Sequence, residues 1–65
     1  MDDKAKLKHL LEHWIEHNQE HGQEFQRWAQ KAQELGASSV HDEIMEAVQL
    51  LEKANICLNR ASDKL

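Results

Sequence analysis

The chain has 65 residues, a formal net charge of −4 with neutral histidines, no proline and one cysteine, Cys57. A chain of this length forms one small domain at most, and such domains usually need a disulfide, a metal or a partner chain. The lone cysteine excludes a disulfide within the chain and fits a reducing compartment. The acidic balance argues against binding to duplex nucleic acid, which needs a basic surface.

No apolar run is long enough to cross a membrane, and the N-terminal region lacks the apolar segment of a secretory signal. We therefore expect a cytoplasmic protein that binds neither membranes nor nucleic acid. Glu, Gln, Ala, Leu and Lys dominate the composition, which is typical of long helices.

The first predicted helix covers residues 3–35. Its apolar positions recur at intervals of three and four residues, as in an amphipathic helix that packs on a neighbour. Two members of this stripe, Asn18 and His21, are polar, and we assign the two tryptophans to the core. The full series is Leu7, Leu11, Trp14, Asn18, His21, Phe25, Trp28, Ala32 and Leu35.

Gly36 is predicted to end this helix, because glycine adopts at little cost the left-handed conformation that closes many helices. The loop covers residues 36–39, and Ser39 is predicted to cap a second helix over residues 40–64. The apolar residues of that helix again recur three and four apart: Val40, Ile44, Ala47, Leu51, Ala54, Leu58, Ala61 and Leu65.

Two helices joined by a short loop form an antiparallel hairpin, so we predict an all-α fold with a single two-helix unit over residues 1–65. An isolated hairpin leaves part of each wide apolar stripe in water. We therefore expect self-association, most simply a homodimer that forms a four-helix bundle.

Residues 9–24 form a ladder of four tetrads that each begin with His and end with Glu. Residues four apart lie on one helix face, one turn above the other. Each four-residue step also turns by about 40°, since a helix advances about 100° per residue. His9 and His13 are therefore expected in solvent, His17 at the edge of the apolar stripe and His21 inside it.

A hairpin that turns at residues 36–39 places residue n opposite about residue 76 minus n. His21 is then expected to face Asn55, with Asn18 close to the same level. The polar members of both stripes would thus gather at one level of the hairpin, which makes this level the best candidate for a site.

One interpretation of the ladder is a transition-metal site, because two imidazoles four residues apart can bind one ion. The ligands would be His13, His17 and His21. Asn18, Asn55 and Cys57 are candidates for a further ligand or a hydrogen-bonding neighbour, and a second chain is another source. Imidazole ligands favour Ni, Co or Zn over Mg or Ca, and binding should weaken below about pH 6 as the imidazoles take up protons.

The alternative is a structural role within a non-enzymatic oligomerisation or adaptor module. A buried Asn or His in a helix seam often only fixes register and oligomer state. In this interpretation His21 and Asn55 are such residues, the histidines respond to pH, and Cys57 is a small buried apolar residue.

The tetrads also spell H-x-x-E-H three times, the zinc-peptidase pattern called inverzincin. A strict four-residue repeat of His and Glu generates this pattern automatically, and 65 residues cannot build the cleft of such an enzyme. The ladder contains no Glu-x-x-His pair, which ferritin-like di-iron sites require. We therefore expect no enzymatic activity and assign no catalytic residue.

Residues 11–21 carry an L-x-H-W-I-E-H-N-x-E-H core. This core resembles that of a small family of uncharacterised prokaryotic helical hairpins, and the similarity extends along nearly the whole chain, through Trp28-Ala29, Leu35-Gly36 and Ala54-Asn55. The resemblance implies a hairpin fold, an association with nickel or cobalt handling, and a role for four residues: His13, His17, Asn18 and His21. It does not imply catalysis.

Overall fold

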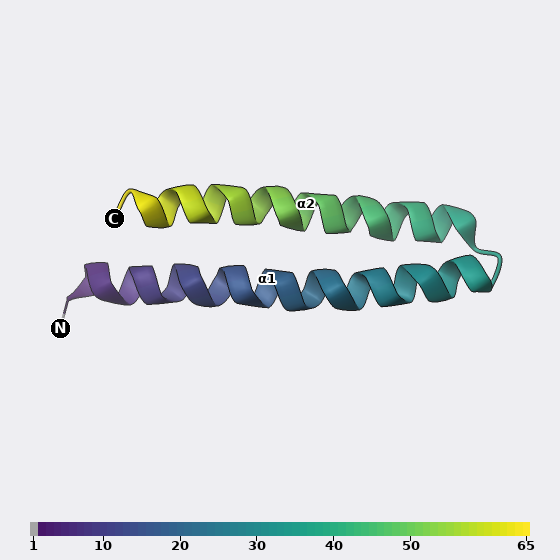
Figure 1. The fold of residues 1–65 in the computed structure, drawn as a ribbon, viewed down its shortest axis with the longest axis horizontal. Coiled ribbons are helices and arrows are strands. Elements are labelled where there is room, and N and C mark those ends of the chain that lie inside the picture. Colours follow the sequence, from purple (N-terminus) through teal and green to yellow (C-terminus); the bar gives the residue numbers. More distant parts are fainter. Residues whose placement is uncertain (1) are drawn as a thin grey trace.

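The structure, a computed structural model, describes residues 2–65 and contains two α-helices (Figure 1). Helix α1 covers Asp3–Glu34 and helix α2 covers Ser38–Asp63. The helices run antiparallel and side by side, and the turn lies at the end of the rod opposite the two termini. The rod measures 52 × 17 × 10 Å. The predicted all-α antiparallel hairpin is confirmed.

Hydrogen bonds close both ends of α1, and the predicted end at Gly36 is confirmed. The Asp2 side chain accepts a hydrogen bond of 3.0 Å from the Lys4 amide, which otherwise has no partner in the first turn. At the other end, Gly36 adopts a left-handed conformation with φ of 80°, and the Ala37 amide donates to the Ala32 carbonyl at 2.8 Å. This bond closes the last turn of α1.

The predicted cap of the second helix is wrong. Helix α2 already begins at Ser38, one residue before the predicted cap Ser39, and the preceding residue Ala37 makes no side-chain capping bond. The first helical bond runs from the His41 amide to the Ala37 carbonyl at 3.0 Å. The compact closure of α1 leaves only three residues between the helices, so both serines fall within the first turn of α2.

The helices meet along an intrachain seam whose members are spaced three and four residues apart and are all buried or half-buried. On α1 the seam comprises Leu11, Ile15, Asn18, Gly22, Phe25, Ala29 and Ala32. On α2 it comprises His41, Ile44, Val48, Leu51, Asn55, Leu58 and Ser62, and Leu65 continues it just after the helix. Only four apolar side chains of the described residues are buried: Leu11, Ala29, Ala32 and Val48. The hairpin therefore has a thin core.

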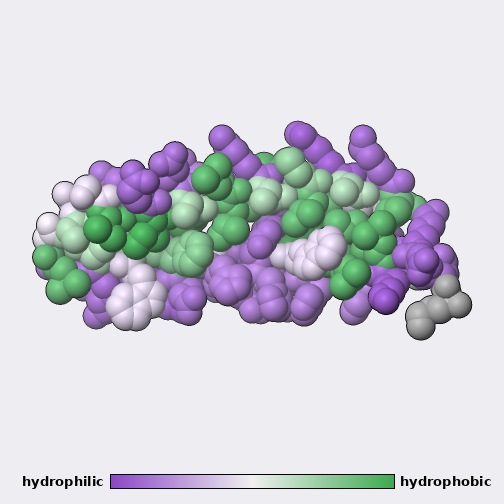
Figure 2. Space-filling model, turned by 180° about the vertical axis from the view of Figure 1, so that it is seen from behind, coloured by the Kyte–Doolittle hydropathy of each residue, from purple (hydrophilic) through white to green (hydrophobic). Residues whose placement is uncertain are grey.

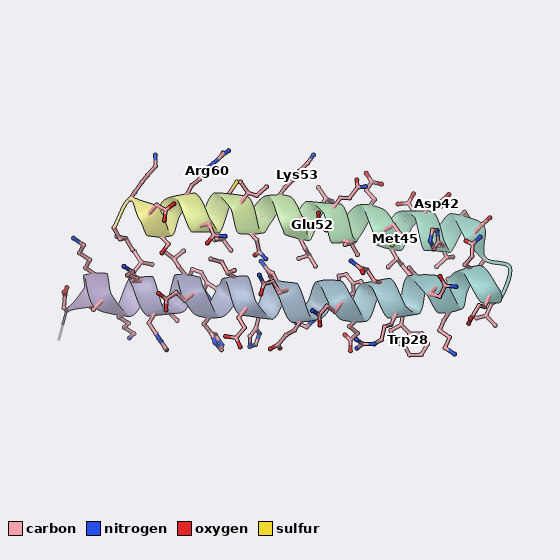
Figure 3. All side chains as sticks on the ribbon, in the orientation of Figure 1. Trp28, Asp42, Met45, Glu52, Lys53 and Arg60 are labelled. Carbon is pink, nitrogen blue, oxygen red and sulfur yellow. The ribbon has the colours of Figure 1, made fainter. Side chains whose placement is uncertain are left out.

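A second column of α1, which we call the open column, stays in solvent. Its members recur every seven residues and are all exposed: Leu7, Trp14, His21, Trp28 and Leu35. The exposed fractions of its four apolar members are 43, 44, 63 and 83 %, in chain order. Trp28 projects from the side of α1 that faces away from α2 (Figure 3). Assigning the two tryptophans to the core was therefore wrong.

The seam covers only part of the apolar stripe of α1. Gly22, Ala29 and Ala32 are buried on the α1 side of the seam, and small residues let two helices approach closely. One neighbouring helix can cover only part of a wide apolar stripe. The open column therefore remains on one flank of the hairpin, although other large side chains, such as Phe25, lie in the seam.

Helix α2 carries a matching column of small residues, the alanine column: Val40, Ala47, Ala54 and Ala61. The two columns lie on the same side, because Trp28 and Ala47 line one open hollow together with Phe25 and Ile44. Figure 2 shows this side, where apolar residues of both helices form a nearly continuous strip along the rod. We call it the open face. Within residues 2–65, neither helix carries an apolar stretch of the length that spanning a bilayer requires.

Substituting the two glycines with alanine should shift the free energy of unfolding in opposite directions. A Cβ on Gly22 would lie 4.0 Å from Leu51 Cδ1, an ordinary contact, so Gly22→Ala should stabilise the hairpin by up to about 1 kcal/mol through helix propensity. Gly36→Ala should destabilise it by about 1 kcal/mol, because alanine strains at positive φ. Urea denaturation followed by circular dichroism measures both, and a loss of stability in Gly22→Ala would contradict the seam geometry.

Candidate functional site

The middle of the intrachain seam holds a polar contact between the two helices. The Asn18 Nδ2 group donates a hydrogen bond of 2.9 Å to Asn55 Oδ1, and Asn55 Nδ2 donates one of 3.3 Å to the Ile15 carbonyl. Among residues 2–65, no buried side-chain nitrogen or oxygen lacks a partner. The prediction that Asn18 and Asn55 share one level is confirmed, and their bonds fix the register of the two helices.

The prediction that His21 faces Asn55 is wrong. Asn18 bonds Asn55, and Gly22 lies against Leu51, so the numbers of facing residues add up to 73 rather than the predicted 76. The shorter turn accounts for this shift of nearly one helical turn. His21 is exposed on the open face, where its ring centroid lies 6.2 Å from that of Phe25.

The four histidines of the ladder are all exposed, as expected for His9 and His13. The ring centroids of His13 and His17 lie 4.3 Å apart with the ring planes tilted by 48°. Those of His17 and His21 lie 6.2 Å apart, nearly edge to face. His13 and His17 are therefore the better placed of these two pairs for binding one ion through both imidazoles.

A single chain offers this ion few other ligands. Among residues 2–65, no three His, Cys, Asp or Glu side chains gather in an arrangement that could hold a metal. Asn18 and Asn55, the predicted neighbours of the site, bond each other in the seam. Cys57 is exposed rather than buried, which contradicts its interpretation as a small core residue.

The fifth histidine, His41, lies apart from the ladder on α2. It is half-buried near the turn, and its Nδ1 atom lies 3.0 Å from Asp42 Oδ1. This contact joins sequence neighbours and gives His41 no link to the histidines of α1.

The side of the hairpin opposite the open face is polar. A groove there is lined by Asn18, Gln19, Gly22, Gln23, Gln26, Val48, Leu51, Glu52 and Asn55. Four of these are exposed or half-buried amides of α1. The groove has no nucleophile or paired acid and base, so its chemistry is that of a solvated surface.

A family model described as a domain of unknown function (DUF8180) matches residues 7–65. The chain belongs to this family. No curated protein and no solved structure matches the chain. The DUF8180 match spans both helices and contains the whole ladder, and it agrees with the resemblance to an uncharacterised family.

The sequence predicted that part of the apolar stripe stays uncovered, but not which residues form the open face. The signal was present, because the stripe of α1 contains both the seam and a seven-residue series of larger side chains. The stripe is wider than one neighbouring helix can cover. Only the observed packing shows which of its members lie in the seam and which lie in the open column.

A double-mutant cycle tests the contact between Asn18 and Asn55. Asn18→Ala should lower the free energy of unfolding by about 1–2 kcal/mol, because it leaves the Asn55 amide oxygen without its partner. Replacing both residues with leucine should lower the free energy of unfolding clearly less than the two single leucine substitutions do when their losses are added. Urea denaturation of the native chain, the two single leucine variants and the double leucine variant measures the coupling. Strict additivity would show that the two amides do not act as a pair.

Proposed function

We propose that the protein is a non-enzymatic helical association module whose open face binds a second copy, giving a homodimeric four-helix bundle. The observation that carries this proposal is the large surface of the single hairpin. A compact protein of 7.6 kDa has an accessible surface of roughly 4,300 Å². The hairpin exposes 5213 Å².

The excess of roughly 900 Å² is close to the area that each partner buries in a standard protein interface, about 800 Å². The apolar strip of the open face runs along the whole rod, so a partner of the same length would cover it (Figure 2). A second copy has this length and carries the same strip, as a two-fold symmetric interface requires. The thin core further supports association, since small helical domains usually need such a complement.

Charge substitutions on opposite sides of α1 test this proposal. The native chain should sediment as a dimer at micromolar concentration. Trp28→Lys places a charge in the open column of both copies and removes two indoles from the interface, so the dissociation constant should rise by about a hundredfold or more. Analytical ultracentrifugation over a dilution series measures this constant.

The matched control is Gln23→Lys, which adds the same charge to the same helix on the polar groove side. It should leave the dissociation constant within about twofold of the native value. A native chain that remains a folded monomer at these concentrations would refute the proposal, as would equal weakening by both substitutions.

Transition-metal binding by the ladder is a second candidate function, favoured by the 4.3 Å separation of the His13 and His17 rings. Both rings are exposed, so an ion can reach them without opening the hairpin. His21 is a weaker candidate ligand because its ring lies farther from that of His17. Ni, Co and Zn suit imidazole donors, and water can fill the remaining coordination positions.

Calorimetric titration with Ni²⁺ near pH 7.5 tests this second candidate on two matched double variants. His13→Ala/His17→Ala leaves only His9 and His21 of the ladder, twelve residues apart, and should weaken binding at least about tenfold. His9→Ala/His21→Ala also removes two ladder histidines but keeps the close pair, and should bind within about threefold of the native chain. Equal losses in the two variants would indicate diffuse binding along the ladder rather than a site at His13 and His17.

A further inference from the structure

The open face is complementary to itself in the size of its side chains. The open column of α1 carries large members at seven-residue intervals, and the alanine column of α2 carries small ones at the same interval. Cores pack densely when large residues of one layer face small residues of the next. A second copy therefore fits best when α1 of each chain lies over α2 of the other.

The heights of the residues in the two columns, measured along the rod, agree with this arrangement. Facing residues add up to 73, so Trp28 and Ala47, which line one hollow, lie within two residues, or about 3 Å, of the same height along the rod. Rotating a second copy by 180° about the long axis keeps every height and exchanges the two helices. Each large side chain then lies within about 3 Å, along the rod, of a small residue of the second copy: Trp28 near Ala47, His21 near Ala54 and Trp14 near Ala61. Both turns lie at the same end of the bundle.

In this packing, candidate metal ligands of the two chains lie close together on the outer side of the bundle, away from the intrachain seams. His17 is turned by about 40° from His21 in the direction away from the intrachain seam. Cys57, three residues after Ala54, is turned by about 60° from the alanine column, also away from the seam. Because facing residues add up to 73, Cys57 of the second copy comes level with residue 16 of the first chain and lies beside His17.

We propose that His13 and His17 of one chain and Cys57 of the second copy bind one transition-metal ion, so that the dimer holds two equivalent sites. The proposal rests on association through the open face. It supplies the third ligand that a single chain lacks among residues 2–65. Two imidazoles and one thiolate suit Co²⁺ or Zn²⁺, with water as a fourth ligand. Both Cys57 and the histidines are exposed in the hairpin, and the thiol releases its proton to solvent when the metal binds.

Co²⁺ titration tests the shared site, because a cobalt–thiolate bond gives a strong near-ultraviolet charge-transfer absorption that imidazole ligands alone do not give. The native dimer should develop this band to one ion per chain. Cys57→Ala and His13→Ala/His17→Ala should each lose it. All substituted side chains are exposed, and circular dichroism verifies that both variants keep their helices.

Mixing the two variants in equal amounts distinguishes a site between chains from one within a chain. Half of the random dimers then combine one chain of each kind and contain one complete site of two, so the band should return to about a quarter of the native intensity. Absence of the band in the mixture, or in the native dimer, would overturn the shared site while leaving self-association intact. A chain that sediments as a monomer under the same conditions would overturn the association itself, and the shared site with it.

Discussion

When two helices pack side by side, each covers one stripe of the other. Apolar side chains outside that stripe must be covered by another chain or remain in water. In this hairpin the covered stripe includes Gly22, Ala29 and Ala32 together with larger residues such as Phe25, and the Asn18–Asn55 bond fixes its register. Trp14 and Trp28 are left on the open face. This division of one wide stripe into a seam and an open column underlies the proposed assembly and the proposed metal site.

The same division gives the four tetrads of the ladder different surroundings. Each tetrad is equivalent in the sequence, but the steady rotation of the stripe carries His21 onto the open face and leaves His13 on the outer side of α1. His17 lies between them, close to His13 and at the edge of the surface that a second copy would cover. Metal binding and association are therefore coupled in our account, because the ligand pair borders the interface.

The sequence was sufficient to predict the elements of the fold. Apolar spacing, the acidic start of α1 and Gly36 predict two helices and their turn, and Asn18 and Asn55 are correctly placed at one level. The register could not be predicted to better than one turn, because it depends on how α1 closes at Ala37 and how many residues the turn retains. That small difference moved Asn55 opposite Asn18 instead of His21. His21 and the tryptophans are exposed because α2 covers a neighbouring part of the apolar stripe. Periodicity identifies an apolar stripe, but it does not say which part of a wide stripe the first neighbour covers.

Burial of the open column by a second copy is the central claim, and the two tryptophans of the chain report on it directly because both lie in that column. Their fluorescence can be recorded over a dilution series with iodide as a quencher. Our account predicts that emission is shielded from iodide at high concentration, and that on dilution it becomes accessible and shifts to longer wavelength as water reaches the indoles. Emission that is equally accessible at every concentration, while the helices remain folded, would contradict it.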